Sequence, residues 1–433
     1  MPIAPAARTS FTMPGMAVTD HVTTVPLDWG DPDGPTIEVF VREVVDASRA
    51  RDDLPGLLFL QGGPGGKAPR PGNVPWVRAL LAHYRVFLLD QRGTGRSTPV
   101  EGRRLTALGG PADQAAYLGH FRADAIVRDA EHLRATLFGG RRWEALGQSY
   151  GGFCTLTYLS LAPEGLAACY VTGGLPSLRP DAAEVYRRTY PRIAAKNQEY
   201  YARFPHDVEV VGRIADRLAA GDVVLPDGDP LTVRRLQLLG LEFGRTVGFD
   251  LVHWLVDEAL ASDGEPREGF LAAIQDLTSF ADNPLFVVLQ ESIYGTPESG
   301  ATAWAAQAAR DRHPDFAETA RPLLFTGETM FPWMVREIRA LQPFRDAVEI
   351  LAARTDWPPL YDLDVLARNE VPLEAAVYYD DMYVDAHLQL ETAAHVGNAH
   401  AWVTNEWEHD GLQDPRVIAR LRELVAERGG PRR

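Results

Sequence analysis

The chain of 433 residues contains only two cysteines, Cys154 and Cys169. Both lie in apolar runs, where a free cysteine behaves as a small buried hydrophobic residue. No cysteine–histidine cluster has the spacing of a zinc site. The sequence therefore predicts two reduced, buried thiols rather than a disulfide, and a protein without a metal site or a cofactor.

Positive charge and long apolar runs are also scarce. Lysine and arginine number 43 against 59 acidic residues, and the net charge of −16 opposes binding to a phosphate backbone. No stretch approaches the roughly eighteen apolar residues that cross a bilayer. Residues 1–16 lack the apolar core of a secretory signal. These absences predict a cytoplasmic protein that binds neither nucleic acid nor membrane.

Short apolar runs dominate the first part of the chain. Runs of this length and composition are typical of strands buried on both faces, as in a parallel sheet covered by helices. A helical pattern over residues 121–139 separates two of them, and a strand-like hairpin over residues 20–45 precedes them all. The runs are 56–60, 84–90, 143–147 and 168–174. Alternating strands and helices predict a doubly wound α/β domain.

The pattern changes after about residue 178 and becomes mostly helical. Strand character returns at 371–379 and 400–408, before a final helix for which Asp414 is the predicted N-cap. The sequence thus predicts one α/β core in two halves, interrupted by a helical cap that is inserted after the sixth strand. The predicted units are 1–177 and 366–433 for the core and 178–365 for the cap.

A serine between two glycines follows the run at 143–147. Gly147-Gln148-Ser149-Tyr150-Gly151 matches the G-x-S-x-G pattern of a nucleophile elbow, a tight strand-to-helix turn that presents a serine for acyl transfer. Glycine and serine also mark ordinary turns. The predicted strand before the motif and helix after it favour the elbow, and Ser149 is the candidate nucleophile.

A glycine-rich loop, residues 61–66, follows the strand at 56–60. Catalytic groups of open α/β sheets gather at the carboxyl ends of the strands, where such a loop supplies a backbone N–H to an oxyanion. The alternative is a simple tight turn. We predict an oxyanion hole formed by the N–H groups of Gly63 and Tyr150. The segment 90–97 lacks the third glycine of a dinucleotide-binding loop.

In this fold, the serine is followed along the chain by an acid and then by a histidine. His409 lies between the last predicted strand and the final helix, which is the position of the base. Asp381 follows the penultimate strand and is the predicted acid. Asp380 is an alternative, and Glu328 is another because it ends an apolar run that resembles a strand.

Taken together, these motifs resemble the proline iminopeptidase family, serine exopeptidases of the α/β-hydrolase fold. The resemblance rests on GGPGG, DQRGTGRS, GQSYGGF, VYYDDMYV and NEWEHDGL, in that order. Gln61 stands where the family has a histidine before the glycines. That histidine is not the triad base, so the change affects a local hydrogen bond only. Asp381 falls on the position of the family's acid.

The resemblance implies release of an N-terminal residue, preferably proline, from small peptides with a free amino terminus. Binding an α-ammonium group away from water requires buried carboxylates. Glu291 is the first candidate in the predicted cap, beside Tyr294, and Glu242 is the second. Either glutamate has a structural alternative, such as an ion pair of Glu242 with Arg245.

Two other functions fit the same motifs. A carboxylesterase or lipase uses the same three catalytic residues but has no need of amine-binding carboxylates. A catalytically inactive protein of the hydrolase fold that binds a ligand is the alternative from another class. Epoxide hydrolases and dehalogenases carry aspartate at the position of Ser149, so the serine argues against both.

Overall fold

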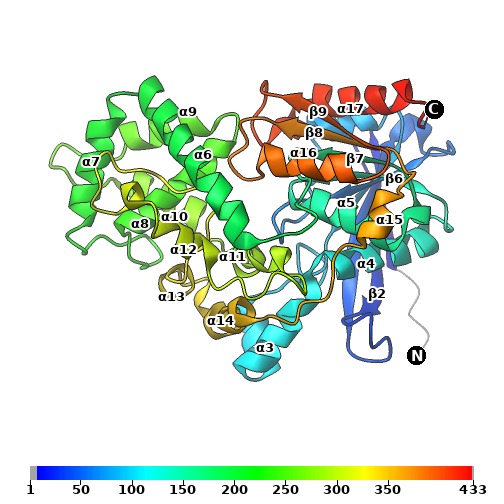
Figure 1. Cartoon of the computed structure of the whole chain (residues 1–433), viewed down its shortest axis with the longest axis horizontal. Helices are drawn as coiled ribbons and strands as arrows, with labels where there is room; N and C mark the ends of the chain where they lie inside the picture. The colour runs from blue at the N-terminus through cyan, green and yellow to red at the C-terminus, as the bar shows by residue number, and fades with distance from the viewer. Residues whose placement is uncertain (1–6, 432–433) are drawn as a thin grey trace.

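Nine strands form one sheet in the computed structural model, which describes residues 7–431 (Figure 1). The strand order is β1-β2-β3-β5-β4-β6-β7-β8-β9. The first four strands in this order pair antiparallel, and from β5 onward all neighbours are parallel. The strands are Ala7–Met13 (β1), Met16–Pro26 (β2), Thr36–Asp46 (β3), Gly56–Leu60 (β4), Arg85–Asp90 (β5), Trp143–Gln148 (β6), Leu166–Thr172 (β7), Leu373–Tyr378 (β8) and Ala399–Thr404 (β9). This mostly parallel sheet confirms the predicted α/β-hydrolase core.

Helices cover both faces of the sheet: α1 and α17 lie on one face, and α4, α5, α15 and α16 lie on the other (Figure 1). The helices are Pro75–Leu80 (α1), Gly102–Leu105 (α2), Pro111–Leu118 (α3), Ala123–Leu137 (α4), Tyr150–Leu161 (α5), Ala182–Arg203 (α6), Asp207–Leu218 (α7), Val233–Gln237 (α8), Gly248–Asp257 (α9), Glu268–Thr278 (α10), Pro284–Leu289 (α11), Ala305–Arg310 (α12), Met334–Glu337 (α13), Arg345–Ala353 (α14), Leu363–Ala367 (α15), Ala386–His395 (α16) and Pro415–Glu427 (α17). As predicted, Asp414 caps α17 by accepting a hydrogen bond from Arg416 N.

Strand β4 is apolar at every position because each of its two faces packs into a different layer of the core. Leu57 and Phe59 point into the layer that contains Trp76 of α1, whereas Leu58 and Leu60 point into the layer of α4 and α5. All five residues of the strand are buried. Each fully buried side chain of this kind stabilises the fold by roughly 1.5–3 kcal/mol. Both faces of the strand are therefore core.

The helical insertion follows the seventh strand of the described chain rather than the sixth. The predicted hairpin is formed by β2 and β3, and β1 pairs with β2 as an additional edge strand. Residues 8–12 of β1 are exposed. An edge strand with exposed side chains has no buried apolar face, so its sequence carries none of the alternation from which strands are predicted.

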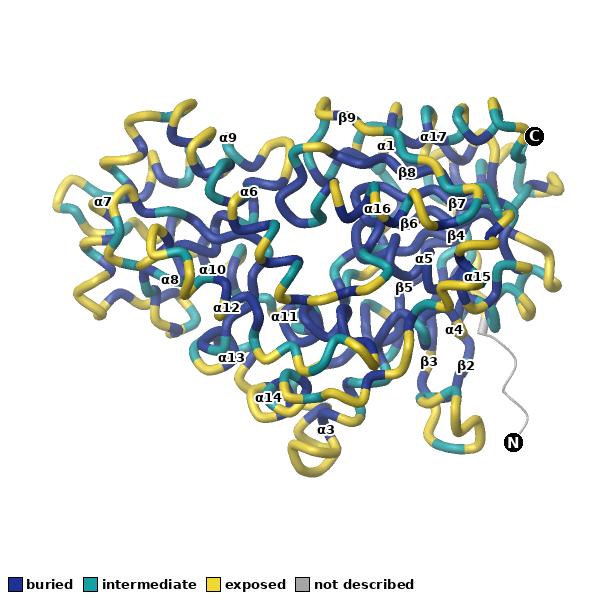
Figure 2. Tube along the Cα trace, viewed as in Figure 1, coloured by how far each residue is buried: buried dark blue, intermediate teal, exposed yellow. Residues whose placement is uncertain are grey.

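Helices α6 to α15 lie between β7 and β8. Within the described residues this segment contains no strand, and its only β-bridges join Val224 to Pro230 and Leu260 to Pro266. In Figure 1 its first helices lie to one side of the sheet, and Figure 2 shows that the outer face of α7 is exposed while the central strands of the sheet are buried. The predicted boundary at residue 365 falls within α15, which packs against α5 of the core.

Cys154 and Cys169 are both buried and unpaired, as predicted. Burial raises the pKa of both thiols, which favours the protonated, unreactive form. In the part of the chain that the structure describes, no helix has the length and apolarity required to cross a bilayer.

Candidate active site

Ser149 occupies the turn between β6 and α5. Its backbone has φ 54° and ψ −125°, a conformation that residues with a side chain rarely adopt. The Ser149 N–H donates to the carbonyl oxygen of Thr172 at 3.0 Å, which ties the turn to the end of β7. The residue is 9% exposed. Strain at one residue held by its surroundings is a common feature of functional sites.

The glycines on either side of Ser149 are required by close packing. A β-carbon on Gly147 would lie 2.3 Å from the carbonyl oxygen of Gly151. A β-carbon on Gly151 would lie 1.9 Å from the carbonyl oxygen of Leu60 in β4. The start of α5 therefore packs directly against β4 and β6. The motif predicted from sequence has a physical basis in these backbone contacts.

We expect Gly151→Ala to destabilise the protein by at least about 1–3 kcal/mol, because the added methyl group overlaps backbone that cannot rotate away. Gly269 in α10 has no atom within 4 Å of its added β-carbon and is the matched control. Gly269→Ala is expected to leave stability unchanged or raise it by up to about 1 kcal/mol, through helix propensity. Urea denaturation of both variants measures the difference. Equal stabilities of the two variants would contradict the packing argument.

His409 and Asp381 form a hydrogen-bonded pair. His409 Nδ1 lies 2.7 Å from Asp381 Oδ2. The other carboxylate oxygen, Oδ1, accepts the backbone N–H groups of Tyr383 at 2.8 Å and Val384 at 3.1 Å. Burial by itself lowers the pKa of His409, but the charge and hydrogen bond of Asp381 raise it above its usual value. The acid is thus held in place and stabilises the protonated imidazole.

The loop after β7 brings the pair next to the serine. A β-carbon on Gly173 would lie 3.1 Å from His409 Nδ1 and 3.2 Å from Asp381 Oδ2. A β-carbon on the next residue, Gly174, would lie 2.2 Å from the carbonyl oxygen of Ser149. The three residues predicted from sequence therefore surround two consecutive glycines, at the carboxyl ends of β6, β8 and β9. Parallel α/β sheets gather their catalytic groups at this edge.

The two alternative acids occupy other positions. Asp380 pairs with Arg192 of α6 at 3.1 Å, and its side chain is 37% exposed. The expectation that Glu328 ends a strand is wrong, since residues 323–330 are irregular. Phe325 in this segment exchanges backbone hydrogen bonds with the side chain of Asn197. Side-chain partners from the helical insertion thus replace a neighbouring strand.

The glycine-rich loop contacts the serine directly. A β-carbon on Gly62 would lie 2.8 Å from the Ser149 β-carbon and 3.4 Å from its Oγ. Gln61 folds back onto the loop: its Oε1 accepts the N–H of Gly62 at 2.8 Å, and its Nε2 donates to the carbonyl of Lys67 at 3.3 Å. These two hydrogen bonds of Gln61 hold the loop closed. Because Gln61 already accepts the N–H of Gly62, the next backbone N–H along the chain is that of Gly63.

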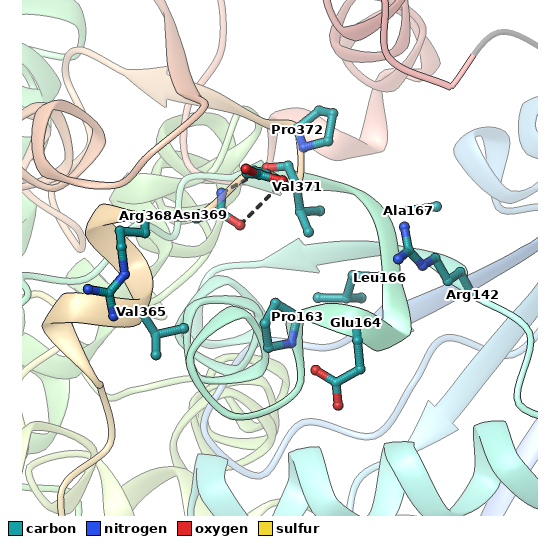
Figure 3. Close-up of a pocket in the computed structure, with 11 residues that line it drawn as sticks. Arg142, Pro163, Glu164, Leu166, Ala167, Val365, Arg368, Asn369, Val371 and Pro372 are labelled. Carbon is teal, nitrogen blue, oxygen red and sulfur yellow. Dashed lines mark hydrogen bonds between the residues drawn. The ribbon is translucent and has the colours of Figure 1, made fainter.

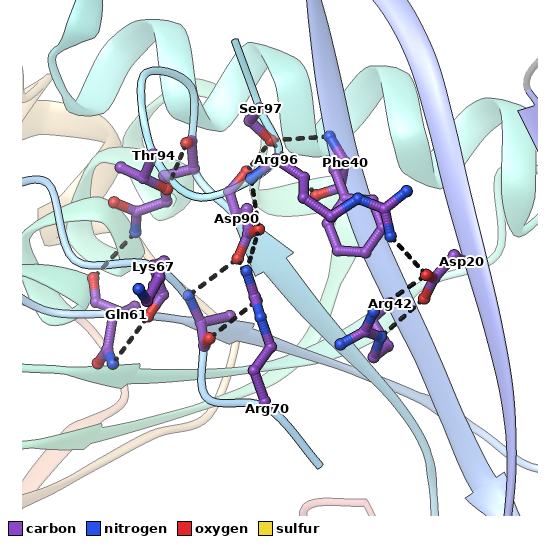
Figure 4. A network of polar contacts seen from close by, with 12 residues as sticks. Asp20, Phe40, Arg42, Gln61, Lys67, Arg70, Asp90, Thr94, Arg96 and Ser97 are labelled. Atoms are coloured by element: carbon purple, nitrogen blue, oxygen red, sulfur yellow. Dashed lines mark hydrogen bonds and ion pairs between the residues drawn. The ribbon is translucent and has the colours of Figure 1, made fainter. Parts of the chain in front are cut away.

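Asp90, at the end of β5, anchors the segment that directly follows this loop (Figure 4). It is fully buried and accepts the backbone N–H of Ala68 at 3.1 Å and that of Arg96 at 2.9 Å. Arg70 binds both oxygens of this carboxylate, at 2.7 and 2.8 Å. A bidentate pair of this kind fixes geometry as well as charge. Gln91 Nε2 also donates to the carbonyl oxygen of Gln61 at 2.9 Å, so the segment 90–97 holds both ends of the glycine-rich loop in position.

The two cap glutamates predicted to bind an amine have protein partners. Glu291 accepts the backbone N–H groups of Ala305 at 3.0 Å and Ala306 at 2.9 Å, at the start of α12. Burial raises its pKa to about 7, although these hydrogen bonds oppose the rise. Glu242 pairs with Arg245 at 3.0 Å. Tyr294 packs edge-on against Phe153 of α5, with ring centroids 5.9 Å apart.

Sequence reasoning did not identify Tyr383. Its ring packs edge-on against the imidazole of His409, with centroids 4.7 Å apart, and its hydroxyl donates to the carbonyl of Leu241 in the insertion. Tyr383 therefore links His409, the candidate base, to the helical segment. The one feature of the sequence that could have identified Tyr383 is its position two residues after Asp381.

A separate surface pocket lies at the other edge of the sheet (Figure 3). It is lined by residues at the amino ends of three strands, including Arg142 before β6, Leu166 at the start of β7 and Pro372 before β8. Ser149 lies at the carboxyl end of β6, so this pocket is distant from the candidate catalytic residues. Across residues 7–431, no group of three histidine, cysteine or acidic side chains is arranged to hold a metal ion.

The fold agrees with a comparison to models of protein families. A family model described as the alpha/beta hydrolase fold matches residues 55–214. The chain is 46% identical to a proline iminopeptidase of Aeromonas sobria, over 96% of this chain and 98% of the relative. It is 35% identical to the proline iminopeptidase aneH of Aspergillus aculeatus, over 95% and 94% of the two chains. Among solved structures, Rv0554 from Mycobacterium tuberculosis aligns over 95% of this chain and 100% of its own, with 14% identity and a TM-score of 0.43. On the strength of the two near-full-length relatives, the chain belongs to the proline iminopeptidase family.

Proposed function

We propose that this protein is a serine exopeptidase that releases N-terminal proline from small peptides. The observation that carries the proposal is the His409–Asp381 pair at 2.7 Å, which lies beside the strained serine of the elbow. A base oriented by a carboxylate next to a serine is the arrangement that activates a hydroxyl for acyl transfer. The near-full-length similarity to proline iminopeptidases supports the choice of substrate.

The proposed reaction begins with attack of Ser149 Oγ on the carbonyl carbon of the N-terminal residue. His409 Nε2 takes the hydroxyl proton and passes it to the leaving amine, while Asp381 stabilises the imidazolium. The oxyanion is received by the N–H groups of Gly63 and Tyr150. Tyr150 is the first residue of α5, so its N–H has no acceptor within the helix. Water then hydrolyses the acyl-enzyme.

We assign the helical segment 178–365 the role of a cap that limits the site to the first residue of the peptide. The assignment is supported by Gly65 of the glycine-rich loop, whose added β-carbon would lie 2.5 Å from the β-carbon of Leu285 in α11. Tyr294 and Phe153 supply aromatic surface for a proline ring. Glu291 and Glu242 supply negative charge for the substrate's amine. The proposed substrates are soluble peptides and the proposed location is the cytoplasm.

Turnover of proline anilide and of N-acetyl-proline anilide tests the proposal. Acetylation removes the positive charge and leaves the scissile bond unchanged, so we expect kcat/KM to fall by about two orders of magnitude or more. Turnover of a simple acyl ester, which has no amine, measures the activity of the proposed triad by itself. Equal turnover of the free and acetylated anilides would contradict the exopeptidase proposal and favour a carboxylesterase.

A further inference from the structure

Residues 241–246 of the insertion lie directly against the loop that carries His409. The backbone N–H of His409 donates to the carbonyl oxygen of Gly244 at 3.0 Å. The carboxylate of the next residue, Asp410, accepts the backbone N–H of Thr246 at 3.0 Å and its hydroxyl at 2.7 Å. The insertion therefore binds the candidate base by its own backbone and by the residue that follows it.

A second part of the insertion binds the residue that precedes His409. Lys196 of α6 donates to Glu408 Oε1 at 2.5 Å. Lys196 is only 2% exposed, and a buried ammonium group that loses its partner carries a large desolvation cost. This ion pair is therefore costly to break. Three consecutive residues, 408 to 410, are thus each bound to the insertion.

Tyr383 extends the same contact to the imidazole. Its ring meets that of His409 edge-on, at an interplanar angle of 76° and with centroids 4.7 Å apart. Its hydroxyl donates to the carbonyl oxygen of Leu241. A β-carbon on Gly244 would lie 2.3 Å from Tyr383 Cζ, so the insertion also packs against the face of the phenol. The ring of Tyr383 is therefore held between the insertion and the imidazole.

The hydrogen bond to Asp381 does not by itself fix the position of the imidazole. That bond holds one ring atom, Nδ1, and leaves the ring able to tilt about this contact. A general base must lie within hydrogen-bond reach of the proton that it removes, and a displacement of about 1 Å costs about two orders of magnitude in rate. The contacts with Tyr383 and Gly244 restrict the remaining freedom of the ring and its backbone.

We infer that the insertion positions the base: residues 241–246 hold His409 in place, with Tyr383 and Asp410 as the positioning residues through which they act. This inference rests on the proposed function and goes beyond it, because the segment assigned to limiting the substrate also orients the imidazole. Neither positioning residue needs to touch the substrate. The effect therefore extends to every substrate, including an ester without an amine.

The first test is Tyr383→Phe, which removes the hydrogen bond to Leu241 and keeps the ring. We expect kcat to fall about 3- to 10-fold, as for loss of one hydrogen bond, and by the same factor for proline anilide and for an amine-free acyl ester. KM is expected to stay within about twofold for both. Tyr379→Phe is the matched control. Tyr379 lies four residues earlier and is 47% exposed, so this variant is expected to match the wild type.

The second test is a double-mutant cycle between Gly244 and Tyr383. Gly244→Ala is expected to lower kcat about 10-fold or more, because its methyl group displaces the phenol ring. The three atoms nearest to that methyl group are Cζ, Cε2 and the hydroxyl oxygen of Tyr383, all of which leucine lacks. In a Tyr383→Leu background, Gly244→Ala is therefore expected to cost less than about twofold. Such non-additivity measures the coupling between the two residues.

Labelling of Ser149 with an active-site phosphonate separates positioning from a structural role. For Tyr383→Phe we expect complete labelling at a reduced rate, since the fold is intact and the base is displaced. A reduced labelled fraction that reacts at the wild-type rate would show partial unfolding and overturn the inference.

Unchanged kcat in Tyr383→Phe, or additive effects in the cycle, would also overturn the inference. A rise in KM for the anilide alone, with normal ester turnover, would show that Tyr383 acts on the substrate instead. If the wild type does not prefer free over acetylated proline anilide, the proposed function fails, and ester turnover still tests the positioning of His409.

Discussion

Replacing Ser149 with alanine is expected to lower kcat for proline anilide by about five to six orders of magnitude, the range seen when a triad serine is removed. The loss is this large because no other hydroxyl in the site occupies the strained turn beside the His409–Asp381 pair. The fold is expected to persist, since the side chain is small and Ser149 N still donates to Thr172. Steady-state kinetics together with circular dichroism measure both effects.

The control for this variant is Ser10→Ala on the edge strand β1, which is expected to retain full activity. The hydroxyl of Ser10 hydrogen-bonds to that of Thr19, and β1 lies far from β6 in the sheet order. Labelling with an active-site phosphonate gives an independent readout. Modification of any serine other than Ser149 would show that the elbow has been assigned wrongly.

Replacing His409 with alanine is expected to cost about as much as the loss of Ser149, because triad members act as a unit. Asp381→Asn is expected to lower kcat by about four orders of magnitude. The geometry explains the loss. The amide oxygen of the new side chain must accept the N–H groups of Tyr383 and Val384, so its NH2 group faces His409 Nδ1. The imidazole is then forced to carry its proton on Nε2, where it cannot act as a base.

Asp380→Asn is the matched control, since Asp380 pairs with Arg192 rather than with His409. It is expected to stay within a fewfold of the wild type. The pH profile gives a second readout. In the wild type, kcat/KM should fall as the pH drops through the raised pKa of His409, because only the neutral imidazole accepts a proton. An active Asp381→Asn enzyme with an inactive Asp380→Asn enzyme would reverse the assignment.

Local patterns predicted much of the core. The apolar run 56–60 coincides with β4, and the final helix begins after Asp414 as its capping signal indicates. These predictions succeed because a strand buried on both faces is apolar throughout, and a side-chain acceptor at the N-cap stabilises the start of a helix. The chain order of serine, acid and histidine also selected Asp381 and His409, which the structure joins by a hydrogen bond.

Predictions that depended on distant partners were less complete. The run at 323–327 is as apolar as a strand, yet the side chains of Asn197 and Gln237 satisfy its backbone in place of a neighbouring strand. Nothing near Glu291 in the sequence shows that its carboxylate caps α12, which begins fourteen residues later. Nothing near Gly327 in the sequence shows that this residue packs against Met382, which follows Asp381.

The sequence by itself determined the parallel core of the sheet, the elbow motif and the candidate histidine and acid, because each depends on residues that are adjacent or on their order along the chain. The tertiary structure alone decided which partners the carboxylates of the insertion have. That decision depends on burial and on hydrogen-bond partners separated by many residues, such as the contact of Gly327 with Met382. A local pattern of residues carries no information about such contacts.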